Sequence, residues 1–333
     1  MSETTPPPHR RRPRYTGTYP RRFHEKYKEH APEQFPDTVA KVLASGKTPA
    51  GAHVPVLVAE VFDILAPRPG ERVVDCTLGY GGHARELLRR ILPGGMLLGL
   101  DVDPLELPRT EARLRGLGFA PEAFITRRSN FAGLPKVLAD TGWTGADCIL
   151  ADLGVSSMQL DTPGRGFSSK APGPLDMRMN PNRGQPASAL LQKVSPDDLA
   201  AILTDNADEP QARILAEALA GQAFADTTDL SRAITAALPL APSDDQALAV
   251  RRVFQALRIA VNDEFAALDT FLRHLPACLS PGGRAAILTF HSGEDRRVKK
   301  AFQAGLRDGS YSAVADTVVR PGPAERRANP RAT

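Results

Sequence analysis

The sequence has few cysteines and no long apolar run. Its three cysteines lie far apart in 333 residues, without a Cys-x-x-Cys pair or a second set of ligands near any of them. This spacing argues against a disulfide framework or a zinc site, so we expect a cytoplasmic protein without a metal. No apolar run approaches the roughly 20 residues of a transmembrane helix. No apolar segment follows the N-terminal arginines as in a secretory signal, so we expect no membrane partner.

Positive charge is concentrated at the N-terminus. The formal net charge is +4, but residues 1–30 hold eight Lys or Arg and three acids, so they net +5 and the other 303 residues net −1. We predict that residues 1–52 form a basic, largely disordered arm. Its basic residues are interleaved with aromatic ones, such as Tyr15, Tyr19 and Phe23. Arginines pair with phosphates and rings stack on unpaired bases, so RNA binding is one interpretation of the arm, and a solubilising tail is the other.

Beyond the arm, short apolar runs alternate with helical patterns. We predict strands at Arg72–Cys76, Met96–Leu100, Ala123–Thr126, Asp147–Ala151 and Arg284–Phe290. We predict helices at Val56–Leu65, His83–Leu92, Arg109–Leu117 and Leu134–Ala139, with Pro108 at the first position of the third helix. Four successive β-α units indicate an α/β fold, in which helices cover both faces of a parallel sheet. The loops that follow the strands then share one edge of the sheet, where ligands bind.

The alternation stops for over a hundred residues after the fourth strand. Residues 160–187 are rich in Gly and Pro, which indicates a loop. Helical patterns follow at Asp197–Leu203, Gln211–Ala220, Thr228–Ala237 and, as one long stretch, about Ala247–Cys278. We therefore predict an α-helical insertion at 159–261 within a sheet domain formed by 53–158 and 262–325, and a C-terminal tail at 326–333. The insertion lies beside the expected cleft, so we predict it as an RNA-recognition domain; a purely structural role, in which its helices pack a second small core, is the alternative.

A glycine-rich turn follows the first predicted strand. It reads Gly79-Tyr-Gly-Gly-His83, and Asp101 ends the next strand nineteen residues after Gly82. Glycines let the backbone turn tightly and approach a ligand, and the N–H groups at a helix start favour an electron-rich group. A carboxylate such as Asp101 can accept both hydrogens of a ribose diol. Together these features are typical of a nucleoside cofactor site, but Gly79 to Ala84 also fits the dinucleotide fingerprint, so the turn leaves the cofactor open.

Asp152 ends the fourth predicted strand, across the expected cleft from the glycine turn. Enzymes that methylate an amino group on an aromatic base need a hydrogen-bond acceptor at such a place, because the lone pair of the amine is delocalised into the ring. Hydrogen bonds from the amine can turn that lone pair toward a sulfonium methyl group, so that positioning supplies most of the acceleration. We predict Asp152 as the catalytic residue; a cap on a turn is the alternative.

Eight segments of the chain stand in the order of a known family. The sequence resembles the bacterial 16S rRNA (cytosine-N4)-methyltransferases, the RsmH or MraW family, over about residues 53–330. The segments are His53-Val-Pro-Val-Leu, Asp75-x-Thr-x-Gly-x-Gly-Gly-His83, Asp152-Leu-Gly-Val-Ser-Ser-x-Gln159-Leu-Asp161, Arg165-Gly-Phe-Ser168, Gly173-Pro-Leu-Asp-Met-Arg-Met179, Arg251-x-x-x-Gln-Ala-Leu-Arg-Ile259, Val261-Asn262 and Phe290-His-Ser-x-Glu-Asp-Arg296. The chain departs from the family at Gly293, where a leucine is usual, and in its tail, which lacks a further strand-like segment.

The resemblance implies a fold, a reaction and a set of contacts. The implied fold is a class I (Rossmann-like) S-adenosylmethionine methyltransferase sheet, and the implied reaction is N4 methylation of a cytidine in the decoding centre of 16S rRNA, within the small ribosomal subunit. The implied contacts to S-adenosylmethionine come from Gly81, Gly82, His83, Asp101, Phe131, Asp152 and Gln159. Whether the protein acts as a monomer or as a homodimer stays open.

Two histidines and one loop are further candidates near the cleft. For His83 a contact to the donor is favoured over a catalytic role. His291 follows the fifth predicted strand and could bind RNA or orient Asp152; a hydrogen-bonded turn histidine is the alternative. The Gly/Pro-rich loop could close over the cytosine and grip phosphate, unless it is simply solvated. Its charged residues include Arg165, Lys170, Asp176, Arg178 and Arg183.

Three rival interpretations remain from the residues alone. An NAD-dependent oxidoreductase on the same sheet would need a hydride-transfer partner such as a Tyr-x-x-x-Lys pair, and the sequence contains none. A non-enzymatic RNA-binding factor would not need the acid at Asp152. The same chemistry on DNA or on a protein amide is separated from rRNA methylation only by the family resemblance.

Overall fold

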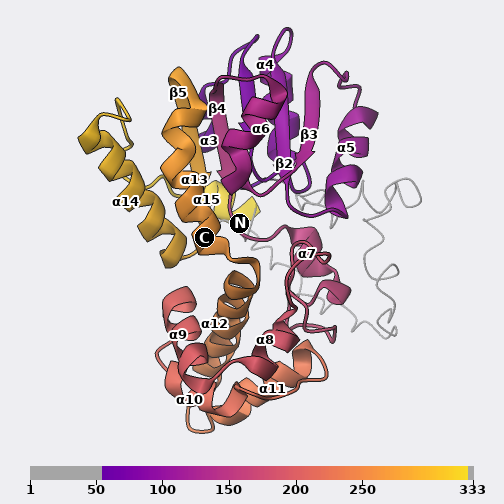
Figure 1. The fold of residues 1–333 in the computed structure, drawn as a ribbon, viewed down its shortest axis with the longest axis vertical. Coiled ribbons are helices and arrows are strands. Elements are labelled where there is room, and N and C mark those ends of the chain that lie inside the picture. Colours follow the sequence, from indigo (N-terminus) through magenta and orange to yellow (C-terminus); the bar gives the residue numbers. More distant parts are fainter. Residues whose placement is uncertain (1–54, 329–333) are drawn as a thin grey trace, which may run out of the picture. The chain divides into compact units, whose positions relative to one another are not determined.

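A five-stranded sheet combines four strands from the N-terminal part of the described chain with a fifth strand that follows the insertion. The computed structural model describes residues 55–328 (Figure 1). The strands are β1 (Arg72–Asp75), β2 (Met96–Asp101), β3 (Phe124–Arg128), β4 (Ala146–Asp152) and β5 (Leu279–Leu288). All neighbouring strands pair in parallel, in the order β3-β2-β1-β4-β5. The predicted parallel α/β sheet is therefore confirmed. The first four predicted strands agree with the observed bounds within two residues, whereas the fifth begins at Leu279, five residues before its predicted start.

The strand order reverses between β1 and β4. The chain runs outward from β1 to β2 and β3, and then returns to place β4 on the other side of β1. In such sheets the ligand cleft lies outside the carboxyl ends of the strands at this reversal. The glycine turn follows β1 and Asp152 ends β4, so both predicted halves of the site lie at that point.

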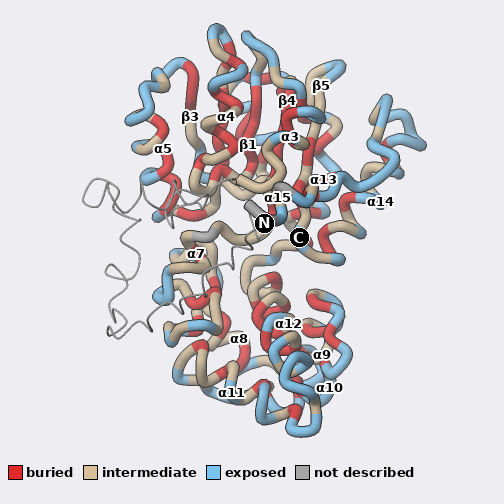
Figure 2. The backbone as a smooth tube through the Cα atoms, turned by 180° about the vertical axis from the view of Figure 1, so that it is seen from behind, coloured by how far each residue is buried: buried red, intermediate tan, exposed pale blue. Residues whose placement is uncertain are grey.

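Helices cover both faces of the sheet because its strands are apolar on both sides (Figure 2). Val73 faces a core shared with α3 (Val58–Leu65), α4 (Gly82–Ile91) and α5 (Glu106–Gly116). Its neighbour Val74 faces the opposite core. The helices of that core are α6 (Leu134–Thr141), α13 (Glu264–Cys278) and α14 (Ser292–Asp308), and the 3-10 turn η2 (Phe131–Gly133) packs beside them.

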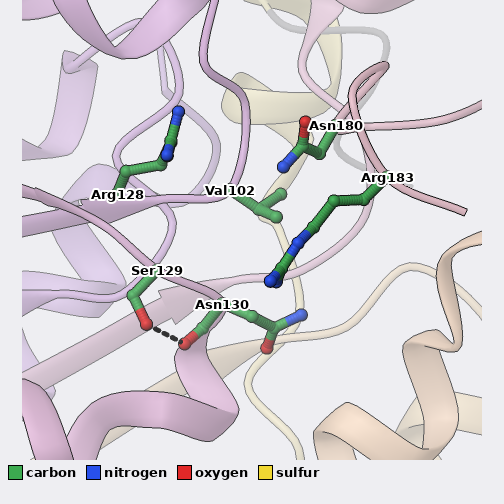
Figure 3. A pocket seen from close by; sticks show the side chains of 6 residues that line it. All are labelled: Val102, Arg128, Ser129, Asn130, Asn180 and Arg183. Carbon is green, nitrogen blue, oxygen red and sulfur yellow. Dashed lines mark hydrogen bonds between the residues drawn. The ribbon is translucent and has the colours of Figure 1, made fainter.

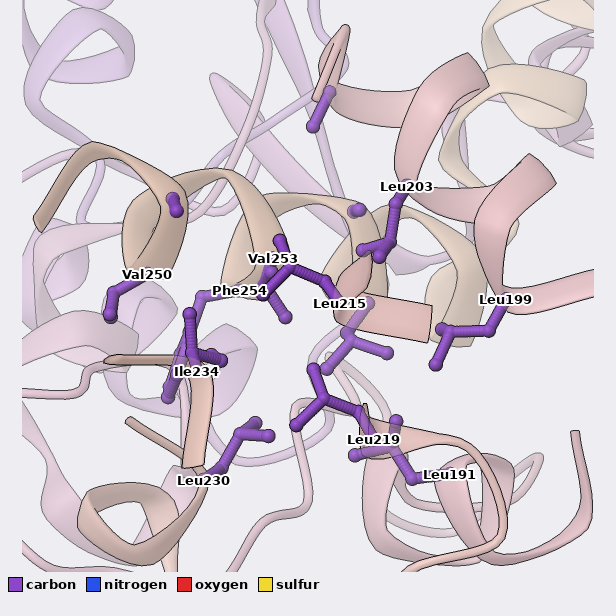
Figure 4. Packing of buried hydrophobic residues seen from close by; sticks show 14 of the residues in the cluster. Leu191, Leu199, Leu203, Leu215, Leu219, Leu230, Ile234, Val250, Val253 and Phe254 are labelled. Atoms are coloured by element: carbon purple, nitrogen blue, oxygen red, sulfur yellow. The ribbon is translucent and has the colours of Figure 1, made fainter. Parts of the chain in front are cut away.

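The insertion forms a helical group with its own apolar core (Figure 4). After α7 (Ser157–Asp161) and a 3-10 turn, η3 (Pro163–Arg165), the chain runs without regular structure to residue 186. The helices that follow are α8 (Ala187–Lys193), α9 (Pro196–Ala207), α10 (Ala212–Leu219), α11 (Thr227–Ala237) and α12 (Ser243–Asn262). Leucines at 199, 203, 215 and 219 are fully buried in this core, so helical amphipathicity in this region was a sound guide.

Three local predictions were wrong. The third helix begins at Glu106, so Pro108 is its third residue and not its first. Helix α8 was missed, because its seven residues directly follow Pro186 and show too short a period to recognise. The long stretch about 247–278 is two helices, since Asp263 adopts a left-handed conformation with φ 53° between α12 and α13.

Gly293 does not disturb the helix after the last strand. Helix α14 begins at Ser292, directly before this glycine. A Cβ on Gly293 would lie 2.6 Å from the ring of Phe265, so that ring fills the space a side chain would take. The guanidinium of Arg297 lies 3.7 Å from the centre of the same ring. The departure from the usual leucine is therefore compensated by packing.

The insertion is fastened to the sheet region at its base. Asn262, the last residue of α12, donates to Met177 O and accepts from Met179 N, each at 2.7 Å. The described residues, 55–328, belong to one compact unit. The domain boundaries at 158/159 and 261/262 therefore stay a prediction. The N-terminal arm at 1–52 and the last five residues of the predicted tail lie outside the described residues.

The C-terminal helix α15 (Pro323–Ala328) closes the described chain. Glu325 accepts a hydrogen bond from the backbone of Leu57 at 3.2 Å. Within residues 55–328 no helix is long and apolar enough to cross a membrane. Over the same residues no group of three or more His, Cys, Asp or Glu could hold a metal ion.

Candidate active site

The glycine turn after β1 is tightly packed against α5. Gly79 and Gly81 have φ angles of 47° and 78°, which favour glycine. A Cβ on Gly81 would lie 2.9 Å from Thr110 Cγ2, and one on Gly82 would lie 3.1 Å from the Pro55 ring. Side chains are excluded here on steric grounds, so the backbone itself forms this wall of the site.

The carbonyl groups of the turn are held by α5. Thr110 donates from its hydroxyl to Gly79 O. Arg113 donates to Tyr80 O from Nη2 at 2.7 Å and from Nε at 3.2 Å, and its guanidinium lies 3.5 Å from the centre of the Tyr80 ring. With the turn fixed from this side, the first N–H groups of α4 have no acceptor within their own helix and suit an electron-rich ligand group.

Asp101 lies at the end of β2 beside the turn. Its Oδ2 accepts from Gly79 N at 2.8 Å, and its Oδ1 accepts from Asp103 N at 2.9 Å. Burial raises the pKa of Asp101 to about 6, although these hydrogen bonds lower it. Each carboxylate oxygen has a further lone pair, so the predicted contact to a ribose diol remains available to this side chain.

A polar cavity of about 300 Å³ adjoins Asp101 (Figure 3). Val102, Arg128, Ser129 and Asn130 line it from the ends of β2 and β3. The other lining residues, Asn180 and Arg183, come from the loop of the insertion, and Figure 3 shows Arg183 reaching across the cavity toward Asn130. The insertion therefore contributes to a pocket that begins at the donor side of the sheet.

Phe131 begins the 3-10 turn η2 directly after this cavity. Its half-buried ring meets the ring of Phe271 edge-on, with the centroids 5.4 Å apart. Asn130 caps the turn by accepting from Ala132 N at 2.9 Å. The turn fixes the ring beside the pocket, and the predicted position of Phe131 next to an adenine stays a prediction.

Asp152 is held by its backbone while its carboxylate is nearly without partners. Thr77 Oγ1 accepts from Asp152 N at 2.6 Å. Among the described residues Oδ1 is buried without a hydrogen-bond partner, and Oδ2 lies 3.6 Å from His83 Nδ1. Burial first, and then the nearby charges of Asp75 and Glu294, raise the pKa of Asp152 to about 7. A partly buried acid that is kept without a cation is typical of a functional group.

His83 is a neutral neighbour of this acid. Its Nε2 lies 3.0 Å from Val56 O, and because a carbonyl only accepts, this nitrogen carries the proton. Burial lowers the pKa of His83 to about 4, so the ring is uncharged at neutral pH and forms no ion pair with Asp152. Its Nδ1 lone pair then faces Asp152 Oδ2, which favours the protonated carboxyl. Neither a donor contact nor a catalytic role of His83 is thereby decided.

Asp75 is a site residue that the sequence analysis did not single out. It ends β1, is 2% exposed and accepts from Thr77 N at 3.1 Å. Burial raises the pKa of Asp75 to about 7, and Asp101 adds to the effect. Its position at a strand end was the available signal, the same signal that pointed to Asp101 and Asp152.

A second unexpected acid, Asp103, ties three parts of the site together. It is 1% exposed and its Oδ2 accepts from Gln159 Nε2 at 2.9 Å and from Arg165 Nη1 at 2.7 Å. Gln159 Oε1 also accepts from Ser156 N at 3.0 Å. The side chains of Gln159 and Arg165 are thus engaged within the protein, and their predicted roles toward donor and RNA remain untested.

Two of the other predicted substrate residues pair with each other, whereas the ring nitrogens of the third, His291, have no hydrogen-bond partner among the described residues. Arg178 and Asp176 form a two-pronged ion pair, with both distances at 2.8 Å. This pair lowers the pKa of Asp176 despite its partial burial. His291 Nε2 lies 3.2 Å from Glu294 Oε1, but the two are not aligned for a hydrogen bond, and neither ring nitrogen has such a partner in the described chain.

Comparisons with known proteins identify the family of this chain. The sequence profile of the MraW methylase family matches residues 50–333. Ribosomal RNA small subunit methyltransferase H 1 of Lachnoclostridium phytofermentans is 46% identical over 340 residues, which cover 99% of this chain and 92% of that protein. Ribosomal RNA small subunit methyltransferase H 2 of Alkaliphilus metalliredigens is 47% identical over 331 residues, with 97% and 94% covered.

A more distant relative matches over as much of its own length. Ribosomal RNA small subunit methyltransferase H of Anaeromyxobacter sp. strain K is 42% identical over 299 residues, which cover 84% of this chain and 94% of that protein. The residues that the family profile matches, 50–333, include the glycine turn, Asp101 and Asp152. The chain belongs to the MraW methylase family.

Proposed function

We propose that this protein transfers the methyl group of S-adenosylmethionine to N4 of a cytidine in the 16S rRNA of the small ribosomal subunit. Membership of the MraW methylase family and the names of the relatives support the reaction class and the rRNA substrate. The observation that carries the chemistry is Asp152, a strand-end acid with one buried and unpartnered oxygen. Its position beside the strand-order reversal is where a substrate group would meet a bound donor.

The residues at the glycine turn fit the methyl donor. Side chains at Gly81 and Gly82 would collide with their surroundings, so the bare backbone is retained where a ligand must approach closely. Asp101 is fixed by two backbone N–H groups and would hold the ribose. We assign the remaining donor contacts to His83 and Phe131. The donor supplies a methyl group activated on a sulfonium.

Asp152 would accept a hydrogen bond from the exocyclic amine of the cytosine. Holding that N–H turns the lone pair of nitrogen out of conjugation and toward the methyl group, and this positioning accounts for most of the acceleration. When the new C–N bond forms, the amine must lose one proton. A carboxylate whose pKa is raised to about 7 is matched to accept it near neutral pH. Neutral His83 does not compete for this role.

The RNA would reach the site with its target base turned out of the stack. Unstacking costs a few kcal/mol, which contacts around the cleft must offset. The loop at residues 162–186 carries four Lys or Arg and one acid, so it nets +3. Its Arg183 lines the cavity beside the donor side. We propose this loop as a phosphate contact, and the basic arm at 1–52 as a second one outside the described residues.

The test uses small ribosomal subunits from a strain that lacks the enzyme. Incubation with the purified protein and S-adenosylmethionine, followed by mass spectrometry of 16S rRNA, should find one added methyl group on N4 of a single cytidine. Transfer of the methyl group to free RNA or to protein, but not to subunits, would contradict the proposed substrate. Fractionation of extracts from a strain that makes the protein should place it in the cytoplasm, and sedimentation of the purified protein should decide between monomer and homodimer.

A further inference from the structure

One aromatic side chain at the active edge is exposed. Phe290 follows β5 and is 48% exposed, and among the large hydrophobic residues exposed in the described chain it is the only aromatic one. Single exposed apolar residues are common on protein surfaces, so exposure alone decides nothing. The position of Phe290 beside the catalytic acid is what calls for an explanation.

The strand register places Phe290 next to the loop that carries Asp152. Strands β4 and β5 pair Asp152 with Leu288, so Phe290 and Gly154 each lie two residues beyond this pair. A Cβ on Gly154 would lie 3.8 Å from Phe290 Cδ2, an ordinary van der Waals distance. The edge of the ring therefore lies beside the backbone of a residue two positions after the acid.

The backbone of Phe290 is fixed even though its ring is exposed. Glu294 is 3% exposed, and its Oε2 accepts from Phe290 N at 2.8 Å. Glu294 is also close enough to Asp152 to raise the pKa of that acid. One buried carboxylate therefore fixes the backbone of Phe290 and also lies near the acid. Gly154 has φ 90° and no side chain, which leaves this side of the ring uncovered.

We propose that the Phe290 ring is the platform on which the target pyrimidine stacks while Asp152 holds its amine, an inference that rests on the proposed function. Enzymes that act on a base turned out of its stack hold it between aromatic or apolar side chains. A phenylalanine ring has no polar atom and gives stacking without discrimination between bases. In this division of labour Asp152 recognises the amine, and Phe290 holds the plane of the base.

The first test compares three variants of Phe290 in methyl transfer to small ribosomal subunits. Phe290→Ala removes the ring, Phe290→Leu keeps apolar bulk, and Phe290→Trp keeps aromaticity. Stacking on a protein ring typically contributes enough to change an equilibrium about 5- to 150-fold. The subunit binds through many other contacts, so the loss should lower kcat by such a factor and leave KM nearly unchanged. Tryptophan should retain most of the rate, whereas leucine should not.

Three controls separate this role from a structural one. Donor affinity measured by calorimetry and the melting temperature should be unchanged in Phe290→Ala. Leu240→Ala, which trims an apolar residue that is 97% exposed in the insertion, should transfer methyl groups at the normal rate. Full activity of Phe290→Leu, or loss of donor affinity in Phe290→Ala, would overturn the proposal. So would a change of oligomeric state in Phe290→Ala at unchanged kcat, since the ring would then cover a second copy.

A second test does not depend on methyl transfer. A short single-stranded RNA that carries one pyrrolocytidine should lose fluorescence when the base stacks on the ring. Quenching should occur with the unaltered protein and with Phe290→Trp, and should be absent with Phe290→Ala. Quenching that persists in the alanine variant would overturn the platform. If the unaltered protein methylates no subunit but quenching follows the ring, the proposed function fails and the platform stands.

Discussion

The carboxyl edge of the sheet and the helices of the insertion differ in whether their charged side chains are paired. At the edge, Asp75 is buried and Asp152 nearby is partly buried, neither has a cation beside it among the described residues, and burial raises the pKa of each to about 7. The segment 187–261, which holds the helices, has six Lys or Arg and ten acids, a net charge of −4, and several of these form ion pairs at the surface. Unpaired buried acids indicate a functional site, whereas paired surface charges mainly keep helices soluble.

Net charge also differs between two parts of the insertion. The loop at 162–186 nets +3 and contributes Arg183 to the cavity, while the helices after it net −4. A polyanion such as RNA is attracted to the loop and not to the helices. The predicted RNA-recognition domain at 159–261 stays a prediction. Because only the loop is positively charged, we propose the loop, and not the helices, as the part that contacts RNA. The variants below compare the effects of substitutions at the sheet edge with those of substitutions in the insertion.

Removal of the acid at the edge should have the largest effect. Asp152→Ala should lower kcat for methyl transfer by about 10²–10⁴-fold, because the amine loses its acceptor. Donor affinity should be partly retained, since Asp101 and the glycine turn are intact. Single-turnover transfer and calorimetry measure the two quantities. Full activity of Asp152→Ala would remove this residue from the mechanism.

Asp101→Ala should act on the donor and not on the transfer step. Loss of a charged acceptor for the ribose should weaken binding of S-adenosylmethionine by about 10- to 100-fold. At saturating donor the rate should recover most of its normal value. Calorimetry and a donor titration of the rate check this. A fall in kcat that saturating donor does not restore would place Asp101 closer to the chemistry than we propose.

Loss of the ion pair between Arg165 in the insertion and Asp103 at the sheet edge should lower the free energy of unfolding. Arg165→Met leaves Asp103, which is 1% exposed, without its cation and should lower the free energy of unfolding by about 3 kcal/mol. Arg165→Lys is the matched control: it keeps a charge but loses the bonds to the carbonyls of Arg178 and Met179. Urea denaturation should rank the methionine variant below the lysine variant. Equal stability of the two would show that the charge of Arg165 matters little.

Asp152 should lower stability as pH rises. Its pKa is raised from 3.8 to about 7 in the folded protein, so the folded state binds the proton more tightly than the unfolded state between these values. Stability is therefore lost as pH increases from about 4 to 7, and stays low above that. Asp152→Asn should raise the melting temperature by roughly 2–6 °C at pH 8 and by less at pH 5. A gain that is equal at both pH values would argue against the raised pKa.

A surface pair of the insertion should give the smallest effect. Arg213 on α10 pairs with Asp197 and Glu217, and all three side chains are largely exposed. Solvent screens such pairs, so Arg213→Ala should leave the melting temperature and methyl transfer unchanged within error. Weaker binding of this variant to small ribosomal subunits would indicate that the insertion helices contact RNA, contrary to our proposal.

Strand ends and the cofactor turn were predictable from sequence because they depend on local patterns. Apolar strands that end in an acid led directly to Asp101 and Asp152, and the family resemblance was confirmed by the profile match. The role of Asp103 was not predictable, since its partners Gln159 and Arg165 lie 56 and 62 residues away. Neither was the break at Asp263, where a non-glycine residue adopts a left-handed conformation within a continuous helical pattern.

The fastening at the base of the insertion has a consequence for how sequences of this kind can diverge. Arg165 anchors the segment that enters the insertion, and Asn262 grips Met177 and Met179 from the helix that leaves it. Both anchors lie at the root, so the turns that join α9, α10 and α11 can lengthen or shorten without shifting the cavity wall. We expect length variation and grafted tags to be tolerated at those distal turns, and rejected between Arg165 and Arg183.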